Sequence, residues 1–297
     1  MNSVVDEIEP ESGQKMPEPT DNRRIGAILI DEGKLRIQDA ERILRAQKEH
    51  GMRFGEAAVF LGLVSESDIQ RALSLQHDYP YLLPNESRVS RKLEAAYQPF
   101  GKQGEALRAL RSQLLLRWFS GEPERRTLAI VSPDRGDGKS VLCANLAVVF
   151  SQLGERTLLI DADLRHPTQH QLFSLGNGSG LSTILSRRAE IDAIEPIPAF
   201  ENLFVLPAGA VPPNPQELLS RSQFALLLET AAARFDVILI DTPAANAYAD
   251  AQTIAVRSSG ALLVTRKHRT RLRDADQLAQ TLTRLSAHMV GAVINEI

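Results

Sequence analysis

The last two thirds of the chain alternate short apolar runs with longer segments of helical period. Helical stretches at residues 140–154, 214–235 and 273–288 separate some of these runs. Such alternation is typical of a parallel sheet with helices on both faces, so this part predicts an α/β fold. The expected strands lie within residues 127–132, 156–165, 203–209, 236–243, 261–267 and 289–297.

The front of the chain contains an internal repeat. RIGAILIDEGKLRIQDAERILRAQ (24–47) and RFGEAAVFLGLVSESDIQRALSLQ (53–76) carry Arg, Gly, Gly, Leu and Gln at equivalent positions, with five residues between the units. Each unit predicts a short helix, a glycine break and an amphipathic helix, with Gly33 and Gly62 at helix ends. Ser65 and Asp68 resemble a capping box. The repeat therefore predicts a small all-α domain.

The repeated polar residues allow two interpretations. A purely structural adaptor would explain the glycines as caps, but it does not explain why Arg and Gln recur at both ends of each unit. A guanidinium group can stack on a base and bind phosphate through two hydrogen bonds. The pattern resembles the MshEN domain of secretion and pilus ATPases, except that Ala58 stands where the first repeat has Leu29. The resemblance implies cyclic di-GMP binding by Arg24, Gly33, Gln47, Arg53, Gly62 and Gln76.

Composition sets the broad class. Hydrophobic residues make up 43% and charged residues 24% of 297, and the net charge of -3 gives no general attraction to nucleic acid. The single Cys143 excludes an internal disulfide and is typical of a reducing compartment. No run approaches the roughly 18 apolar residues that span a bilayer. We expect a cytoplasmic protein that reaches the inner membrane only through a partner.

Four segments are expected along the chain. Residues 1–20 are acidic, contain prolines and have no signal-peptide pattern, so they predict a disordered tail. The helical domain is expected over 21–84, a linker over 85–100 and the α/β domain over 101–297.

The sequence SPDRGDGKS (132–140) predicts a phosphate-binding loop, because it lies between an expected strand and an expected helix. Pro133 replaces the first glycine of the usual pattern, but the phosphate cradle comes mainly from the last five residues. Lys139 is expected to meet the β- and γ-phosphates, and Ser140 to bind Mg²⁺. The nucleotide-binding residues are expected to be Gly136, Asp137, Gly138, Lys139, Ser140 and Val141.

Three carboxylates follow apolar strands. Asp161 and Asp163 end one strand and Asp241 ends another, where ligands bind in open α/β sheets. Each alone could be a helix N-cap. Together, beside a phosphate loop, they favour Mg²⁺ binding and activation of a hydroxyl group.

This combination resembles the bacterial tyrosine kinases, which are relatives of the MinD and ParA ATPases, and it is closest to the EpsG-type kinases of exopolysaccharide chain-length control. The resemblance rests on the phosphate loop, LLIDADLR, ILIDTP, and GAVPPNPQELLSRSQFALLL together with EALRALR. It implies ATP and Mg²⁺ as ligands, with Asp161 and Asp241 at the metal and Asp163 as base. It also implies a membrane-anchored chain-length determinant as partner, adenine contact by Asn295, and a ring joined by Glu105, Arg108 and Arg111.

Two departures leave the activity open. Asp134 replaces the lysine that marks the MinD and ParA switches, which argues against a switch of that type. The chain also has no C-terminal tyrosine cluster; its tyrosines are Tyr79, Tyr81, Tyr97 and Tyr248. The chain could therefore phosphorylate another protein or an interdomain tyrosine. The alternatives are an ATPase switch and a nucleotide-gated scaffold.

Overall fold

The computed structural model describes residues 25–76, 79–82, 87–119, 122, 125–188 and 193–296. The chain divides into two compact units, Met1–Tyr79 and Pro80–Ile297, and each is considered by itself. The expected tail at residues 1–20 and the expected ligand residue Arg24 lie outside the described residues.

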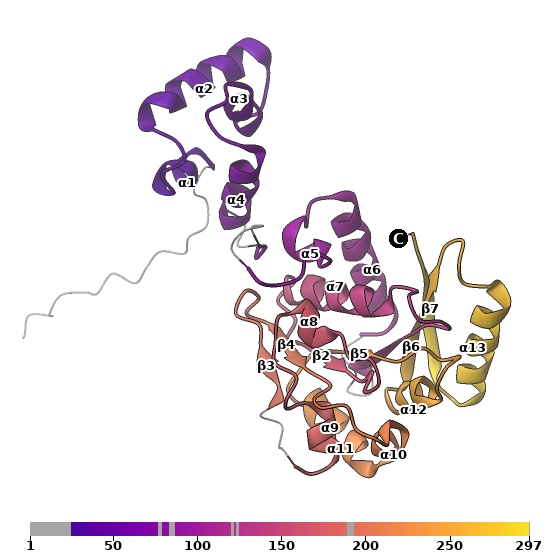
Figure 1. Cartoon of the computed structure of the whole chain (residues 1–297). Coiled ribbons are helices and arrows are strands. Elements are labelled where there is room, and N and C mark those ends of the chain that lie inside the picture. Colours follow the sequence, from indigo (N-terminus) through magenta and orange to yellow (C-terminus); the bar gives the residue numbers. More distant parts are fainter. Residues whose placement is uncertain are drawn as a thin grey trace, which may run out of the picture. The chain divides into compact units, whose positions relative to one another are not determined.

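The described residues of the first unit form four helices, which confirms the predicted helical region (Figure 1). Gly33 and Gly62 follow the two short helices and have φ angles of 69° and 65°, values that favour glycine. The amide of Gly33 donates to the Ile30 carbonyl and that of Gly62 to the Val59 carbonyl, both at 2.9 Å. The two repeats thus share one turn geometry. The helices are α1 (Ile25–Asp31), α2 (Ile37–His50), α3 (Phe54–Phe60) and α4 (Glu66–Gln76).

Packing within this unit crosses between the repeats. Helix α1 packs against α4, and α2 packs against α3, so each short helix covers the long helix of the other repeat. Leu29 and Ala58, which occupy equivalent positions, are both buried in the core. The predicted capping box is also present, because Ser65 N donates to Asp68 Oδ2 at 3.0 Å and Asp68 N donates to Ser65 Oγ at 3.2 Å.

The second unit is built on a seven-stranded sheet, which confirms the predicted α/β fold. The strand order is β3-β4-β2-β5-β1-β6-β7, and the pairs are parallel except for β3 with β4. Strand β3 has two residues and was not predicted. The strands are β1 (Thr127–Val131), β2 (Thr157–Asp161), β3 (Glu195–Pro196), β4 (Leu203–Leu206), β5 (Val237–Asp241), β6 (Gly260–Arg266) and β7 (His288–Asn295).

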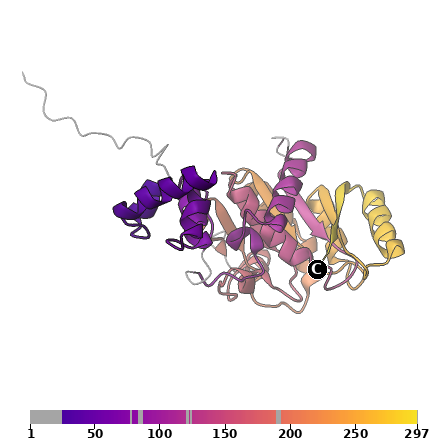
Figure 2. The same cartoon turned by 90° about the horizontal axis from the view of Figure 1, so that it is seen from above.

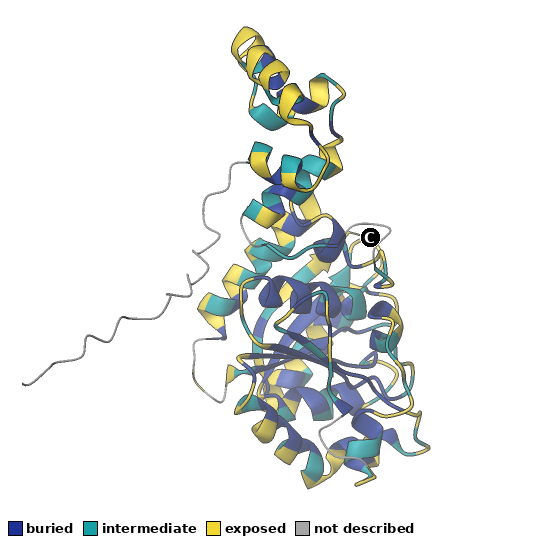
Figure 3. Ribbon diagram, turned by 90° about the vertical axis from the view of Figure 1, so that its left-hand side faces the viewer, coloured by how far each residue is buried: buried dark blue, intermediate teal, exposed yellow. Residues whose placement is uncertain are grey.

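Helices cover both faces of the sheet (Figures 1 and 2). Two hydrophobic clusters fill the spaces between the helices and the strands, and the central strands are buried (Figure 3). One face carries α5 (Glu94–Tyr97), α6 (Lys102–Arg117), α7 (Lys139–Ser151) and α8 (Gln169–Leu172). The other carries α9 (Leu181–Leu185), α10 (Pro215–Ser220), α11 (Ser222–Ala232), α12 (Asp250–Arg257) and α13 (Leu272–Arg284).

The expected linker at residues 85–100 needs correction. Its described part, residues 87–100, contains α5, and Leu93, Ala95 and Ala96 are buried in the core of the second unit. Ala95 N donates to Asn145 Oδ1 at 2.9 Å, which fixes this segment to α7. Small apolar side chains let α5 approach α7 closely, so the segment is part of the folded unit.

Candidate active site

The phosphate loop connects β1 to α7, as its sequence predicts. Gly136 and Gly138 both have φ of 89°, a region that other residues rarely adopt. The loop forms part of a pocket of about 220 Å³. The lining residues are Arg135, Gly136, Gly138, Lys139, Ser140, Val141, Asp163, His166 and Thr168.

Asp137 and Asn295 shape the loop from outside the pocket. The Asp137 carboxylate accepts hydrogen bonds from Asp134 N at 3.0 Å and from Thr270 Oγ1 at 2.9 Å. Asn295, at the end of β7, donates to the Asp137 carbonyl at 3.2 Å. Both residues were expected at the nucleotide, and in this structure their side chains connect the loop to the β6–α13 turn and to β7.

Ser140 and Asp241 lie together at the start of α7. Ser140 Oγ donates to Asp241 Oδ1 at 3.1 Å, and Lys139 Nζ lies 3.5 Å from the same hydroxyl group. Lys139 is only 7% exposed. The expected metal-binding hydroxyl group therefore contacts the carboxylate that ends β5, and the expected phosphate-binding lysine lies beside that hydroxyl group.

Asp161 and Asp241 are register partners at the ends of β2 and β5, and both are fully buried. Burial raises the pKa of each carboxyl group, and the Asp241 charge raises the pKa of Asp161 further. Lys139 lowers the pKa of Asp241 and so offsets part of this effect. Two buried carboxylates side by side favour a bound cation, because a cation relieves their repulsion.

Asp161 also organises the turn that follows β2. Its Oδ2 atom accepts hydrogen bonds from the amides of Thr168 and Gln169, both at 2.9 Å, and its Oδ1 atom accepts one from Asp163 N at 3.2 Å. Asp161 is therefore not the N-cap residue of the short helix α8, which is Thr168, but its carboxylate accepts hydrogen bonds from the amides where that helix begins. Asp161 makes these hydrogen bonds while it lies beside Asp241, its register partner at the end of β5.

Asp163 occupies the wall of the pocket. Its Oδ1 atom accepts hydrogen bonds from Arg165 N at 3.2 Å and from His166 N at 2.9 Å. Both bonds end on the same carboxylate oxygen, and Asp163 is one of the residues that line the phosphate pocket. Of the three predicted carboxylates, Asp163 is the one placed to meet a group that enters from solvent.

Gln169 is a residue that the sequence reasoning missed. Its Nε2 atom donates to Asp241 Oδ2 at 2.8 Å and to the Ser140 carbonyl at 3.1 Å. Its backbone amide binds Asp161. The side chain is fully buried, and within the described structure its Oε1 atom has no hydrogen-bond partner. A lone glutamine in a polar stretch carries no sequence signal, yet this one connects the phosphate loop to both buried carboxylates.

The donor set fits Mg²⁺. This cation prefers oxygen ligands and is usually held by one or two carboxylates together with substrate phosphates and water. Ser140, Asp161 and Asp241 supply such oxygens, and burial raises the pKa of both carboxyl groups, an effect that Lys139 offsets only in part and only at Asp241. The ion would neutralise charge on the β- and γ-phosphates.

A partly buried ion pair holds the Asp163 turn from the side. The Arg165 guanidinium binds both carboxylate oxygens of Asp250, at 2.7 and 3.3 Å, and Asp250 is buried. Arg165 also lies over the Tyr248 ring, 4.0 Å from its centroid. The arginine of the D-x-D-x-R motif thus fixes the turn to the segment after β5.

The three residues expected to join subunits all lie on α6. Glu105 is mostly exposed and pairs with Arg108, which also donates to the Pro99 carbonyl. Arg111 donates to the Val149 carbonyl at 2.7 Å and so contacts α7. Glu105 is therefore the member of this set that is best placed to meet another chain.

The expected ligand residues of the helical unit lie at the turns and ends of its helices. Gly33, Gly62 and Arg53 are exposed, and Gln47 and Gln76 are half-buried. Arg53 N donates to Glu56 Oε2 at 2.9 Å, which leaves the exposed guanidinium outside that bond.

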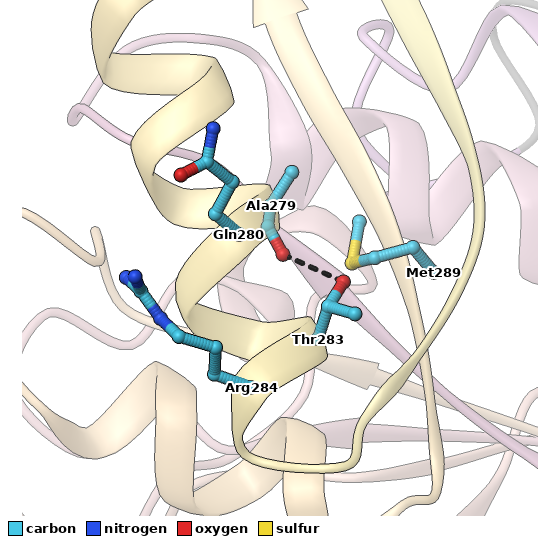
Figure 4. Close-up of a pocket in the computed structure, with 5 residues that line it drawn as sticks. All are labelled: Ala279, Gln280, Thr283, Arg284 and Met289. Atoms are coloured by element: carbon cyan, nitrogen blue, oxygen red, sulfur yellow. Dashed lines mark hydrogen bonds between the residues drawn. The ribbon is translucent and has the colours of Figure 1, made fainter.

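A second hollow, of about 430 Å³, lies between α13 and β7 (Figure 4). Its lining residues are Ala279, Gln280, Thr283, Arg284 and Met289, and Thr283 Oγ1 is bonded to the Ala279 carbonyl at 2.9 Å. This hollow has no glycine loop and no carboxylate, so the chemistry belongs to the smaller pocket.

The chain is similar in sequence and in fold to known P-loop NTPases and bacterial tyrosine kinases. The ParA family model, described as NUBPL iron-transfer P-loop NTPase, matches residues 124–296. Tyrosine-protein kinase YwqD of Bacillus subtilis is 35% identical over 209 residues, which cover 70% of this chain and 87% of that protein. Tyrosine-protein kinase wzc of Salmonella typhimurium is 36% identical over 65% of this chain but 27% of its own length. The kinase domain of the Escherichia coli tyrosine kinase ETK superposes with a TM-score of 0.67 and 31% identity, covering 74% of this chain and 86% of that domain.

Proposed function

Because the chain belongs to the bacterial tyrosine kinases within the ParA group of P-loop NTPases, we propose that it transfers phosphate from ATP to tyrosine in the control of exopolysaccharide chain length or export. The observation that carries the proposal is the single pocket in which Lys139, Ser140 and Asp163 meet beside the buried Asp161 and Asp241. Phosphoryl transfer needs this combination of a phosphate cradle, a metal site and a group that takes the hydroxyl proton.

Each residue has a defined part in this proposal. The loop amides and Lys139 bind the β- and γ-phosphates. Ser140, Asp161 and Asp241 hold Mg²⁺, and Gln169 keeps Asp241 and the loop together. Asp163 accepts the proton of the incoming tyrosine hydroxyl group, since it lies on the pocket wall.

We also propose a membrane-anchored chain-length determinant as partner. Among the described residues, no helix has the length and apolar character to cross a membrane. In Salmonella wzc the matched segment is about a quarter of a longer chain. A kinase of this kind would work in the cytoplasm and be recruited to the inner membrane by the partner. The exposed Glu105, with Arg108 and Arg111 beside it, would join copies into a ring.

The experiment is incubation of the full chain with labelled ATP and Mg²⁺, with and without the partner's cytoplasmic segment, followed by phosphotyrosine analysis. Labelled tyrosine supports the kinase. ADP release without labelled tyrosine would favour the alternative of a MinD- or ParA-like ATPase switch. If neither ADP nor labelled tyrosine forms, the remaining alternative is a nucleotide-gated scaffold.

A second function is proposed for the helical unit, namely binding of cyclic di-GMP. The observation that favours it is the equivalence of the two repeats, which share the glycine turn and pack crosswise. Two equivalent halves suit a dinucleotide with two-fold symmetry, with Arg24 and Arg53 meeting base or phosphate.

Calorimetry with the full chain tests this binding. Loss of one charged contact costs about 1.5–3 kcal/mol, roughly ten- to a hundredfold in affinity. Arg53→Ala and Arg24→Ala should each weaken binding by that factor, while Lys48→Ala, between the repeats, should not. If no heat is measured with cyclic di-GMP at about tens of micromolar, the concentration range of a weak site, the helical unit is a structural adaptor.

A further inference from the structure

The tyrosines of this chain differ sharply in their surroundings. Tyr97 is buried and its hydroxyl group donates to the Val89 carbonyl. The Tyr81 hydroxyl oxygen is also buried, and Tyr79 ends the first unit. Tyr248 lies elsewhere, in the segment that follows Asp241 and β5. It is half-buried, and its neighbours Ala247 and Ala249 are exposed.

The segment that carries Tyr248 is fixed to the phosphate loop. Ala245 N donates to the Ser132 carbonyl and Asn246 N donates to the Pro133 carbonyl, both at 3.0 Å. The Asn246 side chain donates to Asp134 Oδ1 at 3.1 Å. Three hydrogen bonds therefore hold the backbone just before Tyr248 against the start of the loop.

The Tyr248 ring lies over the turn that carries the proposed base. Arg165 stacks on it at 4.0 Å, and the His166 ring centroid is 6.5 Å from the tyrosine centroid. The amides of these two residues are the donors to Asp163 Oδ1. His166 and Asp163 both line the phosphate pocket. Tyr248 thus packs against the turn whose residues Asp163 and His166 line the site that would hold ATP.

We propose that Tyr248 is an autophosphorylation site of this chain, a proposal that rests on the kinase function above. In the step, the Tyr248 hydroxyl oxygen forms a bond to the γ-phosphorus of ATP. The bond from that phosphorus to the β–γ bridging oxygen breaks, and ADP leaves with the electron pair. The phenolic proton passes to Asp163. Phenols ionise near pH 10, so transfer at neutral pH requires such a base.

The surroundings suit the product as well as the reactant. A phosphotyrosine carries a charge of about −1.5 to −2 and pairs readily with a guanidinium group. Arg165 already contacts the ring and is held in place by Asp250. The modified side chain would therefore lie beside a guanidinium group that Asp250 holds in place.

The experiment incubates the purified full chain with Mg-ATP, in the presence of a glutamate–tyrosine copolymer as a general tyrosine substrate, and maps phosphate by mass spectrometry. Phosphate is expected on Tyr248. Tyr248→Phe keeps the stack on Arg165 and should lose that phosphate while still labelling the copolymer. Tyr97→Phe is the matched control and should keep the phosphate on Tyr248. A tagged Lys139→Met copy, mixed with parent, shows whether transfer occurs between copies or within one.

The outcomes distinguish this inference from the kinase function on which it rests. Labelled copolymer without phosphate on Tyr248 overturns the proposal and leaves the kinase standing; Tyr248 would then only cover Arg165. Labelling of neither substrate overturns both. Phosphate on Tyr248 of the Lys139→Met copy alone, without active parent, would also refute it, because the transfer would not depend on the proposed site.

Discussion

Replacing Gln169 by leucine tests whether this buried side chain organises the metal site. The change removes a hydrogen bond to a carboxylate, worth about 1.5–3 kcal/mol, and one to a carbonyl oxygen, worth about 1 kcal/mol. Gln169 is fully buried, so water does not replace these donors. Added apolar burial offsets part of the loss, and we expect the free energy of unfolding to fall by about 2 kcal/mol.

The same change should weaken Mg²⁺-dependent nucleotide binding. The Gln169 amide lowers the pKa of Asp241 by donating to it, so its loss favours the protonated form that does not bind a cation. We expect at least a tenfold loss, about 1.4 kcal/mol. Urea unfolding followed by the fluorescence of Trp118, the only tryptophan, measures the first effect. Titration with a fluorescent nucleotide at several Mg²⁺ concentrations measures the second.

The control lies on the same short helix. Gln171 is exposed on α8, and Gln171→Leu should leave both quantities within about 0.5 kcal/mol of the parent. The reasoning fails if Gln169→Leu matches Gln171→Leu in stability and in Mg²⁺ dependence. A loss of stability with unchanged Mg²⁺ dependence would limit Gln169 to packing.

Three further predictions follow from the site and from α6. Asp163→Asn should retain Mg-ATP binding and lose phosphate transfer, whereas Asp241→Ala should weaken Mg²⁺-dependent nucleotide binding. Nucleotide titration together with phosphotyrosine blotting distinguishes the two effects. If both variants behave like the parent chain, the assignment of these carboxylates to the active site is wrong. Burial raises the pKa of Asp161 in the folded state, so its stabilising contribution is complete below about pH 4 and is lost as the pH rises through the folded value. With Mg²⁺ chelated, the Tm of Asp161→Asn should therefore fall less than the Tm of the parent chain between pH 5 and pH 8. An equal or steeper fall in the variant would contradict this. Glu105→Arg should repel Arg108 of a neighbouring copy and give smaller species in light scattering with nucleotide bound, and unchanged assembly would leave Glu105 as an ordinary exposed side chain.

The sequence predicted those parts of the fold whose signal is local. Strands β1, β2 and β5 are continuous apolar runs, and all their residues are buried. Strand β3 has two residues and pairs only through β4, so it left no pattern. The expected helix at 214–235 divides at Arg221, where ψ is 155°; a break in backbone direction with no glycine or proline at that position is set by packing.

In the candidate site, too, only the features that have a local sequence signal were predictable. The phosphate loop and the carboxylates were predictable because a strand end beside a glycine-rich turn fixes where they lie. The contacts that hold them were not predictable, because they join distant segments. Asp137 binds Thr270, and Gln169 binds Asp241. No local pattern reports which polar side chain will occupy the space between two strand ends.

The crosswise packing of α1 on α4 and of α2 on α3 makes the two repeats dependent on each other for folding. Either repeat alone would expose the apolar face that the other covers, so the unit should melt in one cooperative transition. Cutting the chain between the repeats should be tolerated while both pieces remain, whereas deleting one piece should unfold the other. A duplicated sequence has in this way become a single folding unit with two equivalent halves.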